Sequence, residues 1–196
     1  MTPPDGHGSE GLIGKGVARP NVKRLIHGRG RYTDDIAVPH MLYIAFVRSP
    51  YGHARINSVD TSMATNAVGV VRIITGAQVA EICEPMLAIA AHRPGHKSAP
   101  QHAMAVDHAC YQGEPVAAVV ATSRAEAEDA ADLVMVDYEE LPAVMDIMEA
   151  LDPSSPPIHP DLGDNHCFEH TTVTGDAAAA LAKAAFTVEH EFEFGR

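Results

Sequence analysis

The alternation of apolar and polar residues divides the chain into short strands and short helices. Residues 41–48 (MLYIAFVR) form a nearly unbroken apolar run bounded by Pro39 and Pro50, which predicts a buried strand. Further strands are predicted over residues 54–60, 68–75, 103–111, 116–121, 134–138, 166–173 and 186–194. The last of these, FTVEHEFEF, alternates most strictly and predicts a strand with one apolar face.

The predicted helices are short, and several carry clear end signals. Ser123 is followed three residues later by Glu126, a capping-box pattern that predicts a helix from Ser123 to about residue 133. Pro20 and Gly28 are suited to the start and the end of another short helix. Other helices are expected over residues 61–67, 76–82, 146–151 and 176–185. Interspersed strands and helices favour an α+β fold, with a mixed or antiparallel sheet and short packing helices.

Two segments have the composition of irregular structure. Residues 1–16 are polar and rich in Gly and Pro, which predicts a flexible leader and shows no apolar core of a signal peptide. Residues 154–164 are rich in Pro, Ser and Asp and are expected to form a linker or a long excursion.

Composition narrows the class of protein. The chain has 196 residues, of which 46% are hydrophobic and 20% charged, values that are ordinary for a globular domain. Its 14 Lys and Arg against 26 Asp and Glu give a net charge of −12, which argues against a nucleic-acid binder. No apolar run is long enough for a transmembrane helix. Three irregularly spaced cysteines do not form a disulfide framework, so a reducing cytoplasm is the expected location.

A histidine-rich loop is the first candidate for chemistry. His92, His96, His102 and His108 are potential ligands for zinc, copper or nickel. The Pro-Gly pair before His96 prevents a helical i,i+4 arrangement, and no Cys or carboxylate lies at ligand spacing within the loop. A solvated loop is therefore the preferred interpretation, and a free-standing metal- or anion-binding module that uses the His92–His108 loop is the alternative.

Other candidate motifs do not assemble a catalytic site. In a strand, His166 and His170 would point to one face and Cys167 to the other, which separates them as metal ligands. The chain has no G-x-S-x-G nucleophile motif. Cys83 and Cys110 are predicted to be buried small hydrophobic residues rather than nucleophiles. No set of residues supports catalysis by this chain alone.

Three parts of the chain, taken together, resemble one family. The first comprises residues 28–36 (GRGRYTDDI) and 41–56 (MLYIAFVRSPYGHARI). The second comprises residues 111–121 (YQGEPVAAVVA) and 136–144 (VDYEELPAV), and the third is the terminal VEHEFEF. In this order and spacing they are similar to the large, molybdenum-bearing subunit of the xanthine dehydrogenase, aldehyde oxidase and aerobic carbon monoxide dehydrogenase family, over roughly residues 12–196.

The resemblance implies the α/β-hammerhead domain that begins that subunit. Residues 17–185 would form this domain, and residues 186–196 would be the strand that leads toward a molybdenum-binding domain. In the family, the large subunit binds molybdopterin and hydroxylates a carbon centre with oxygen from water. Electrons then pass through iron–sulfur clusters, often onward to FAD.

The chain departs from the family pattern where catalysis would lie. It stops at Arg196, without a Gly-Gly-x-Phe-Gly loop, a cofactor-contacting Gln motif or a late catalytic Glu. Cys83, Cys110 and Cys167 lack the spacing of iron–sulfur ligands. No catalytic, cofactor-binding or metal-binding residue is therefore assigned, and the chain is not expected to act alone. Either a naturally split subunit that begins at Met1 or a truncated product would explain this.

The expected role is structural, in the assembly of an oxidoreductase. The expected partners are a molybdenum-domain polypeptide of the same large subunit and iron–sulfur and flavin subunits. Two turns are predicted to supply the contacts between domains, or alternatively only to shape the fold: Ser49, Tyr51 and His53 in one, and Gln112, Gly113 and Glu114 in the other. Carbon monoxide, an aldehyde and an N-heterocycle all remain open as substrates.

Overall fold

The computed structural model describes residues 14–88 and 92–194. The chain divides into two compact units, one ending at Met41 and the other beginning at Leu42. The predicted domain boundaries after residues 16 and 185 remain predictions.

The described part of the N-terminal unit, residues 14–41, contains one short helix and one 3₁₀ turn. Helix α1 spans Val22–Ile26, as the Pro20 and Gly28 signals predict, and η1 spans Thr33–Asp35. Gly28 has a positive φ of 67°, the left-handed conformation that commonly follows the end of a helix.

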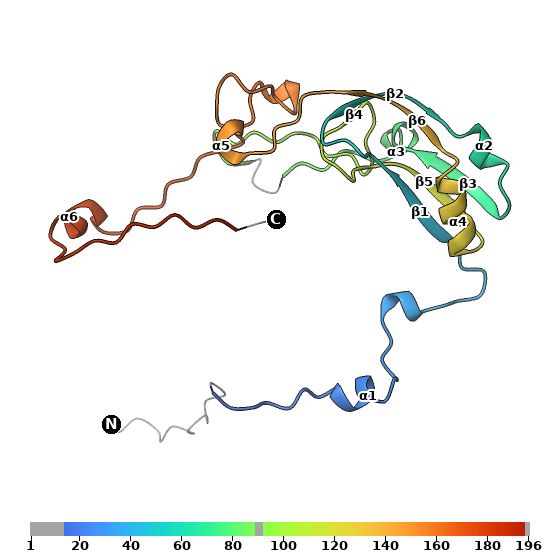
Figure 1. Ribbon diagram of the computed structural model, residues 1–196, viewed down its shortest axis with the longest axis horizontal. Helices are drawn as coiled ribbons and strands as arrows, with labels where there is room; N and C mark the ends of the chain where they lie inside the picture. Colours follow the sequence, from blue (N-terminus) through green and yellow to red (C-terminus); the bar gives the residue numbers. More distant parts are fainter. Residues whose placement is uncertain (1–13, 89–91, 195–196) are drawn as a thin grey trace. The chain divides into compact units, whose positions relative to one another are not determined.

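The second unit contains a three-stranded antiparallel sheet in the order β1-β5-β3. Its strands are β1 (Tyr43–Arg48), β5 (Pro115–Ala121) and β3 (Val70–Thr75). Figure 1 shows helix α4 (Arg124–Ala131) lying against this sheet, with the shorter α2 (Ser62–Thr65) nearby. The central strand is a continuous run of small and β-branched residues because it is covered on both faces.

Small side chains allow the helix to approach the sheet closely. The core cluster consists of Ala64, Ala117, Val119, Ala130 and Val134. Ser123 caps α4, since its hydroxyl accepts the backbone N–H of Glu126 at 3.3 Å. The Glu126 carboxylate accepts the hydroxyls of Thr122 and Ser123 rather than the Ser123 N–H, so the predicted capping box is only half formed. These two hydroxyls lower the pKa of Glu126.

A second antiparallel sheet has the order β4-β2-β6. It is formed by β4 (His108–Ala109), β2 (Ala54–Asp60) and β6 (Met135–Glu140). Ile56 of β2 packs with Ala105 and with Val116 of β5, so the two sheets share a core at the start of β5. The predicted α+β class is confirmed.

The strand predicted over residues 103–111 is wrong for most of its length, because only His108 and Ala109 pair as β4. The preceding residues bond to two different segments. Ala105 donates its N–H to the carbonyl of Pro115, and the carbonyl of Asp107 accepts the N–H of Ile56. The segment therefore crosses between the two sheets instead of running along either one.

Residues 166–173 and 186–194 were predicted as strands, and neither forms one in the described part of the chain. A strand needs a second backbone to pair with, and side-chain alternation alone does not supply it. The apolar residues of the second segment stay exposed; Phe186 retains 82% of its accessible surface and Phe194 retains 90%.

The other predicted helices form but are shorter than expected. They are α3 (Gly76–Ala80), α5 (Ile147–Ala150) and α6 (Ala177–Ala182), and the predicted linker contains η3 (Pro160–Leu162). Among the described residues, no helix has the length and apolar character needed to cross a membrane.

The close contact at the start of α3 gives a test of the fold. A Cβ at Gly76 would overlap the backbone carbonyl of Ala105, which belongs to the buried crossing segment. We expect Gly76→Ala to lower the free energy of unfolding by about 2 kcal/mol or more, because backbone must move to make room. Urea unfolding followed by circular dichroism measures this.

Gly16→Ala is the matched control, since a Cβ there meets nothing within 4 Å. Equal midpoints for the two variants would contradict the packing described for Gly76.

Candidate functional site

The structure brings together the two turns that the sequence singles out. Ser49 accepts the N–H of Gly113 at its backbone carbonyl (2.8 Å) and donates its own N–H to the carbonyl of Glu114 (2.9 Å). The guanidinium of Arg48 also donates to the carbonyl of Gly113, at 2.8 Å. Residues about 65 positions apart in the sequence therefore form one backbone-linked surface feature, the paired turns (residues 48–53 and 110–115).

Two of the six predicted contact residues are buried within this chain. Ser49 is 2% exposed and His53 is 6% exposed. The Ser49 hydroxyl accepts the N–H of Tyr51 at 3.1 Å. The His53 Nδ1–H donates to the carbonyl of Pro142 at 2.8 Å, which ties the first turn to the end of β6. These two side chains therefore hold the first turn in place.

Tyr51 and Gln112 lie closer to solvent. Tyr51 is partly buried, and its ring meets the edge of Tyr138 with 5.4 Å between the ring centroids. Burial raises the pKa of the Tyr138 hydroxyl, which has no hydrogen-bond partner among the described residues. Gln112 is exposed, and Gly113 has a φ of 88°, which shapes the turn that presents it.

Glu114 faces back into its own turn. Its carboxylate accepts the N–H of Cys110 at 2.6 Å. Burial raises the pKa of Glu114, and hydrogen bonds from the N–H groups of Cys110 and Tyr111 only partly offset that rise.

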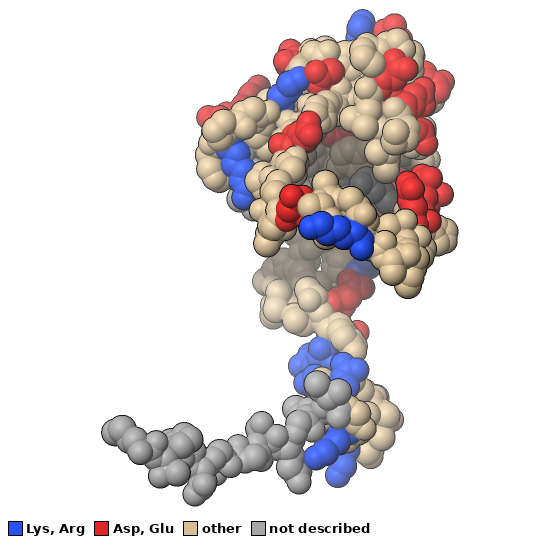
Figure 2. All heavy atoms as spheres, turned by 90° about the vertical axis from the view of Figure 1, so that its left-hand side faces the viewer, with Lys and Arg blue, Asp and Glu red and all other residues tan. Residues whose placement is uncertain are grey.

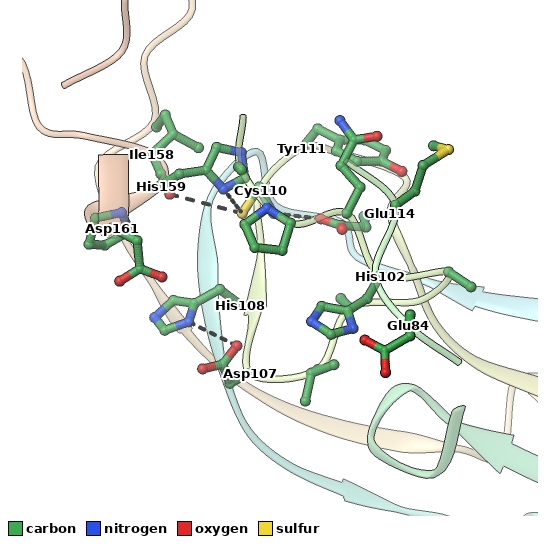
Figure 3. A pocket seen from close by; sticks show the side chains of 18 residues that line it. Glu84, His102, Asp107, His108, Cys110, Tyr111, Glu114, Ile158, His159 and Asp161 are labelled. Carbon is green, nitrogen blue, oxygen red and sulfur yellow. Dashed lines mark hydrogen bonds and ion pairs between the residues drawn. The ribbon is translucent and has the colours of Figure 1, made fainter. Parts of the chain in front are cut away.

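A groove of about 980 Å³ lies beside the paired turns (Figure 3). Its titratable lining residues come from three separate stretches of chain: Glu84, His102, Asp107, His108, Cys110, Tyr111, Glu114, His159 and Asp161. The Cys110 thiol lies 3.9 Å from the carbonyl oxygen of Ile158 and 3.7 Å from Nδ1 of His159. These contacts hold the 158–159 segment along one side of the groove.

The electrostatics of this groove oppose nucleophilic catalysis by the thiol. Burial, with Glu114 and then Asp107 nearby, raises the pKa of Cys110 to about 11. Burial and, secondarily, His53 lower the pKa of His159. At neutral pH the thiol and the imidazole are therefore both uncharged, whereas a reactive cysteine needs a thiolate.

The histidine-rich loop does not gather its imidazoles. His96 stacks on Phe168 with ring centroids 4.9 Å apart, and His108 lies beside Asp107 at 3.4 Å. Across residues 14–88 and 92–194, no three His, Cys, Asp or Glu side chains are placed to hold a metal ion. Cys83, Cys110 and Cys167 are all free thiols, and Cys83 is exposed, so its predicted burial is wrong. The described residues thus do not fit the ligand set of an iron–sulfur cluster.

Sequence reasoning missed the groove itself. The pairing of Cys110 with His159 joins positions 49 residues apart, and neither residue belongs to a motif that marks it. The sequence feature that could indicate the groove is Glu114, a carboxylate between Gly113 and Pro115 at the start of an apolar strand.

Two three-stranded antiparallel sheets with short covering helices, linked through paired turns, define an α+β domain of the hammerhead class. The chain belongs to the aldehyde oxidase and xanthine dehydrogenase family, because the model of that family's a/b hammerhead domain matches residues 27–142.

Individual relatives agree with the family match. The chain is 37% identical over 185 residues to the nicotine 6-hydroxylase large subunit of Paenarthrobacter nicotinovorans, covering 94% of this chain and 22% of that protein. It is 34% identical over 208 residues to the carbon monoxide dehydrogenase large chain of Afipia carboxidovorans, covering 95% and 25% respectively. The chain therefore spans about a quarter of the length of these relatives.

Solved structures show the same fold. Quinoline 2-oxidoreductase from Pseudomonas putida 86 superposes with a TM-score of 0.76 at 39% identity, covering 86% of this chain and 21% of that one. Aldehyde oxidoreductase from Desulfovibrio gigas gives a TM-score of 0.74 at 31% identity, covering 87% and 19%.

The raised pKa of Cys110 leads to a reactivity test. At pH 8 only about one Cys110 in a thousand is a thiolate, and that fraction rises about tenfold per pH unit toward pH 11. We expect iodoacetamide to label Cys110 far more slowly than the exposed Cys83 and Cys167, with a rate that climbs steeply above pH 9. Peptide mass spectrometry after timed quenching follows each site.

Labelling in 8 M urea serves as the control, because unfolding removes the burial and should make the three rates similar. Fast labelling of Cys110 at pH 8 in the folded protein would contradict the neutral thiol.

Proposed function

We propose that this chain is the N-terminal hammerhead component of a molybdopterin-dependent hydroxylase or dehydrogenase large subunit, with a structural and assembly role. The observation that carries the proposal is the extent of the similarity. It runs over 94% of this chain but only 22% of a relative named as a large subunit. In this proposal, a molybdenum-domain polypeptide supplies the part of the large subunit that the chain does not match.

The cofactors belong to the rest of the complex in this proposal. The described residues offer no grouped metal ligands and no cysteine cluster. In this proposal, molybdopterin, iron–sulfur clusters and FAD are held by the molybdenum-domain polypeptide and by the iron–sulfur and flavin subunits. The complete complex would oxidise a small carbon substrate with oxygen from water. Relatives named for nicotine, carbon monoxide and xanthine support the reaction class without selecting the substrate.

The paired turns are the proposed contact surface. Ser49 and His53 are buried, so their part is to hold the first turn in shape, and Gly113 does the same for the second. In this proposal, the partly exposed Tyr51 and the exposed Gln112 contact the partner. The carboxylate of the half-buried Glu114 stabilises the second turn by accepting the N–H of Cys110.

The segment Phe186–Phe194 supports the need for a partner. Phe186, Val188, Phe192 and Phe194 share one side of an alternating pattern and are between 76% and 90% exposed. Apolar side chains with this spacing fit an edge position on another sheet, where a paired backbone and a covered face become available.

This proposal is tested by binding to the polypeptide of the same genome that carries the molybdenum-domain motifs. We expect a stable complex with the full chain. Replacing Phe192 and Phe194 by Ser should weaken the complex about 10-fold to 100-fold, because buried aromatic residues contribute strongly at interfaces. Co-expression followed by biolayer interferometry measures both.

The matched control replaces Val68 and Ile82 by Ser, since these are equally exposed apolar residues outside the segment, at 83% and 82%. The proposal fails if the wild-type chain remains a lone monomer beside that polypeptide. Equal weakening by both pairs of substitutions would remove the segment from the interface.

A further inference from the structure

Charge is strongly segregated along this acidic chain. Residues 15–31 carry six Lys or Arg and no Asp or Glu, whereas residues 42–194 carry seven Lys or Arg and 22 Asp or Glu. Figure 2 shows blue side chains gathered on the described part of the N-terminal unit and red ones predominating on the other unit. A positive surface is therefore present locally in a protein whose total charge is −12.

The basic segment has a defined local structure, which we call the basic hook (residues 19–32). At the end of α1, Gly28 donates its N–H to the carbonyl of Leu25 at 3.0 Å, and Arg29 donates to the carbonyl of Arg24 at 2.9 Å. The chain then reverses, and Leu25 packs over Gly30, where a Cβ would lie 2.9 Å from Leu25 Cδ2. The turn thus brings the backbones of Arg24 and Arg29 together.

The charges of the hook are available for binding. Its five cationic residues are all exposed: Arg19, Lys23, Arg24, Arg29 and Arg31. Among the described residues of the same unit, 14–41, none of the five forms an ion pair with an acidic side chain. Apolar side chains lie among them, with Ile26 74% exposed and Tyr32 65% exposed.

This mixture identifies the chemistry of the partner. Arginine guanidinium groups form two-point hydrogen bonds to carboxylates, and arginine and tyrosine are enriched at the centres of protein interfaces. Contact with a phosphate backbone would remove little of the exposed Ile26 side chain from water. Contact with a protein surface can bury this side chain, which is favourable. A helix of five residues is also far too short to lie in a membrane surface as an amphipathic anchor.

We propose that the basic hook docks onto an acidic protein surface of the molybdenum-domain polypeptide, separately from the paired turns. This inference rests on the proposed function and adds the charge of the partner's surface. Opposite charges would speed association and fix orientation, while Ile26 and Tyr32 would supply the apolar contact.

The experiment measures binding of the full chain to the molybdenum-domain polypeptide with Arg24 and Arg29 both replaced by Gln. We expect the affinity of R24Q/R29Q to fall about tenfold at 50 mM NaCl and its dependence on salt to become weaker. Wild-type affinity should itself fall as NaCl is raised to 500 mM. The fold of the variant is checked by circular dichroism.

The control is R72Q/R93Q, which removes two exposed arginines outside the hook and causes the same change in net charge. If wild type binds and R24Q/R29Q matches it in affinity and salt dependence, the hook proposal is overturned while the proposed function stands. If wild type does not bind at all, both fail. Hook-dependent binding of a 20-base-pair DNA duplex, with no effect on the polypeptide, would overturn the choice of an acidic protein partner.

Discussion

The two backbone hydrogen bonds between Ser49 and residues 113–114 are the constraint on which the second unit depends. Ser49 directly follows β1, and Pro115 opens β5, so these bonds set where the central pair of the first sheet begins. The same turn leads within five residues into β2 of the second sheet. A shift of these two hydrogen bonds would displace both sheets, because β1 could not remain paired with β5 while β2 remained paired with β4 and β6. The full burial of Ser49 follows from that position.

The predicted elements were most accurate where backbone pairing and side-chain pattern agree. Most of residues 41–48, 54–60 and 116–121 form strands because each lies between two partners or along one long partner. The prediction that residues 41–48 are buried is wrong, because β1 is an edge strand that leaves Ile44 and Phe46 exposed. Residues 186–194 have the strictest alternation and form no strand in the described chain, because period-two patterning describes which face is apolar and says nothing about which backbone is adjacent. Residues 103–111 failed for the opposite reason: their partners exist but belong to different sheets.

The candidate site was predicted in part. Local sequence features predict the two turns as contact surfaces. The structure places the turns against each other, and no local feature of the sequence predicts that proximity. The burial of His53 depends on the carbonyl of Pro142, 89 positions away, and the groove depends on the 158–161 excursion. The basic hook is not evident from the net charge of the whole chain, since an average over 196 residues hides a local excess of five cations.

The segment Phe186–Phe194 carries three glutamates on the side opposite its aromatic residues. Two copies stacked in register, as in a fibril, would place identical glutamates about 4.8 Å apart on neighbouring chains. Their mutual repulsion at neutral pH makes such self-stacking unfavourable, although the aromatic face alone would promote it. The glutamates thus oppose aggregation of this segment with its own copies. Protonation of the glutamates at acidic pH would remove that repulsion.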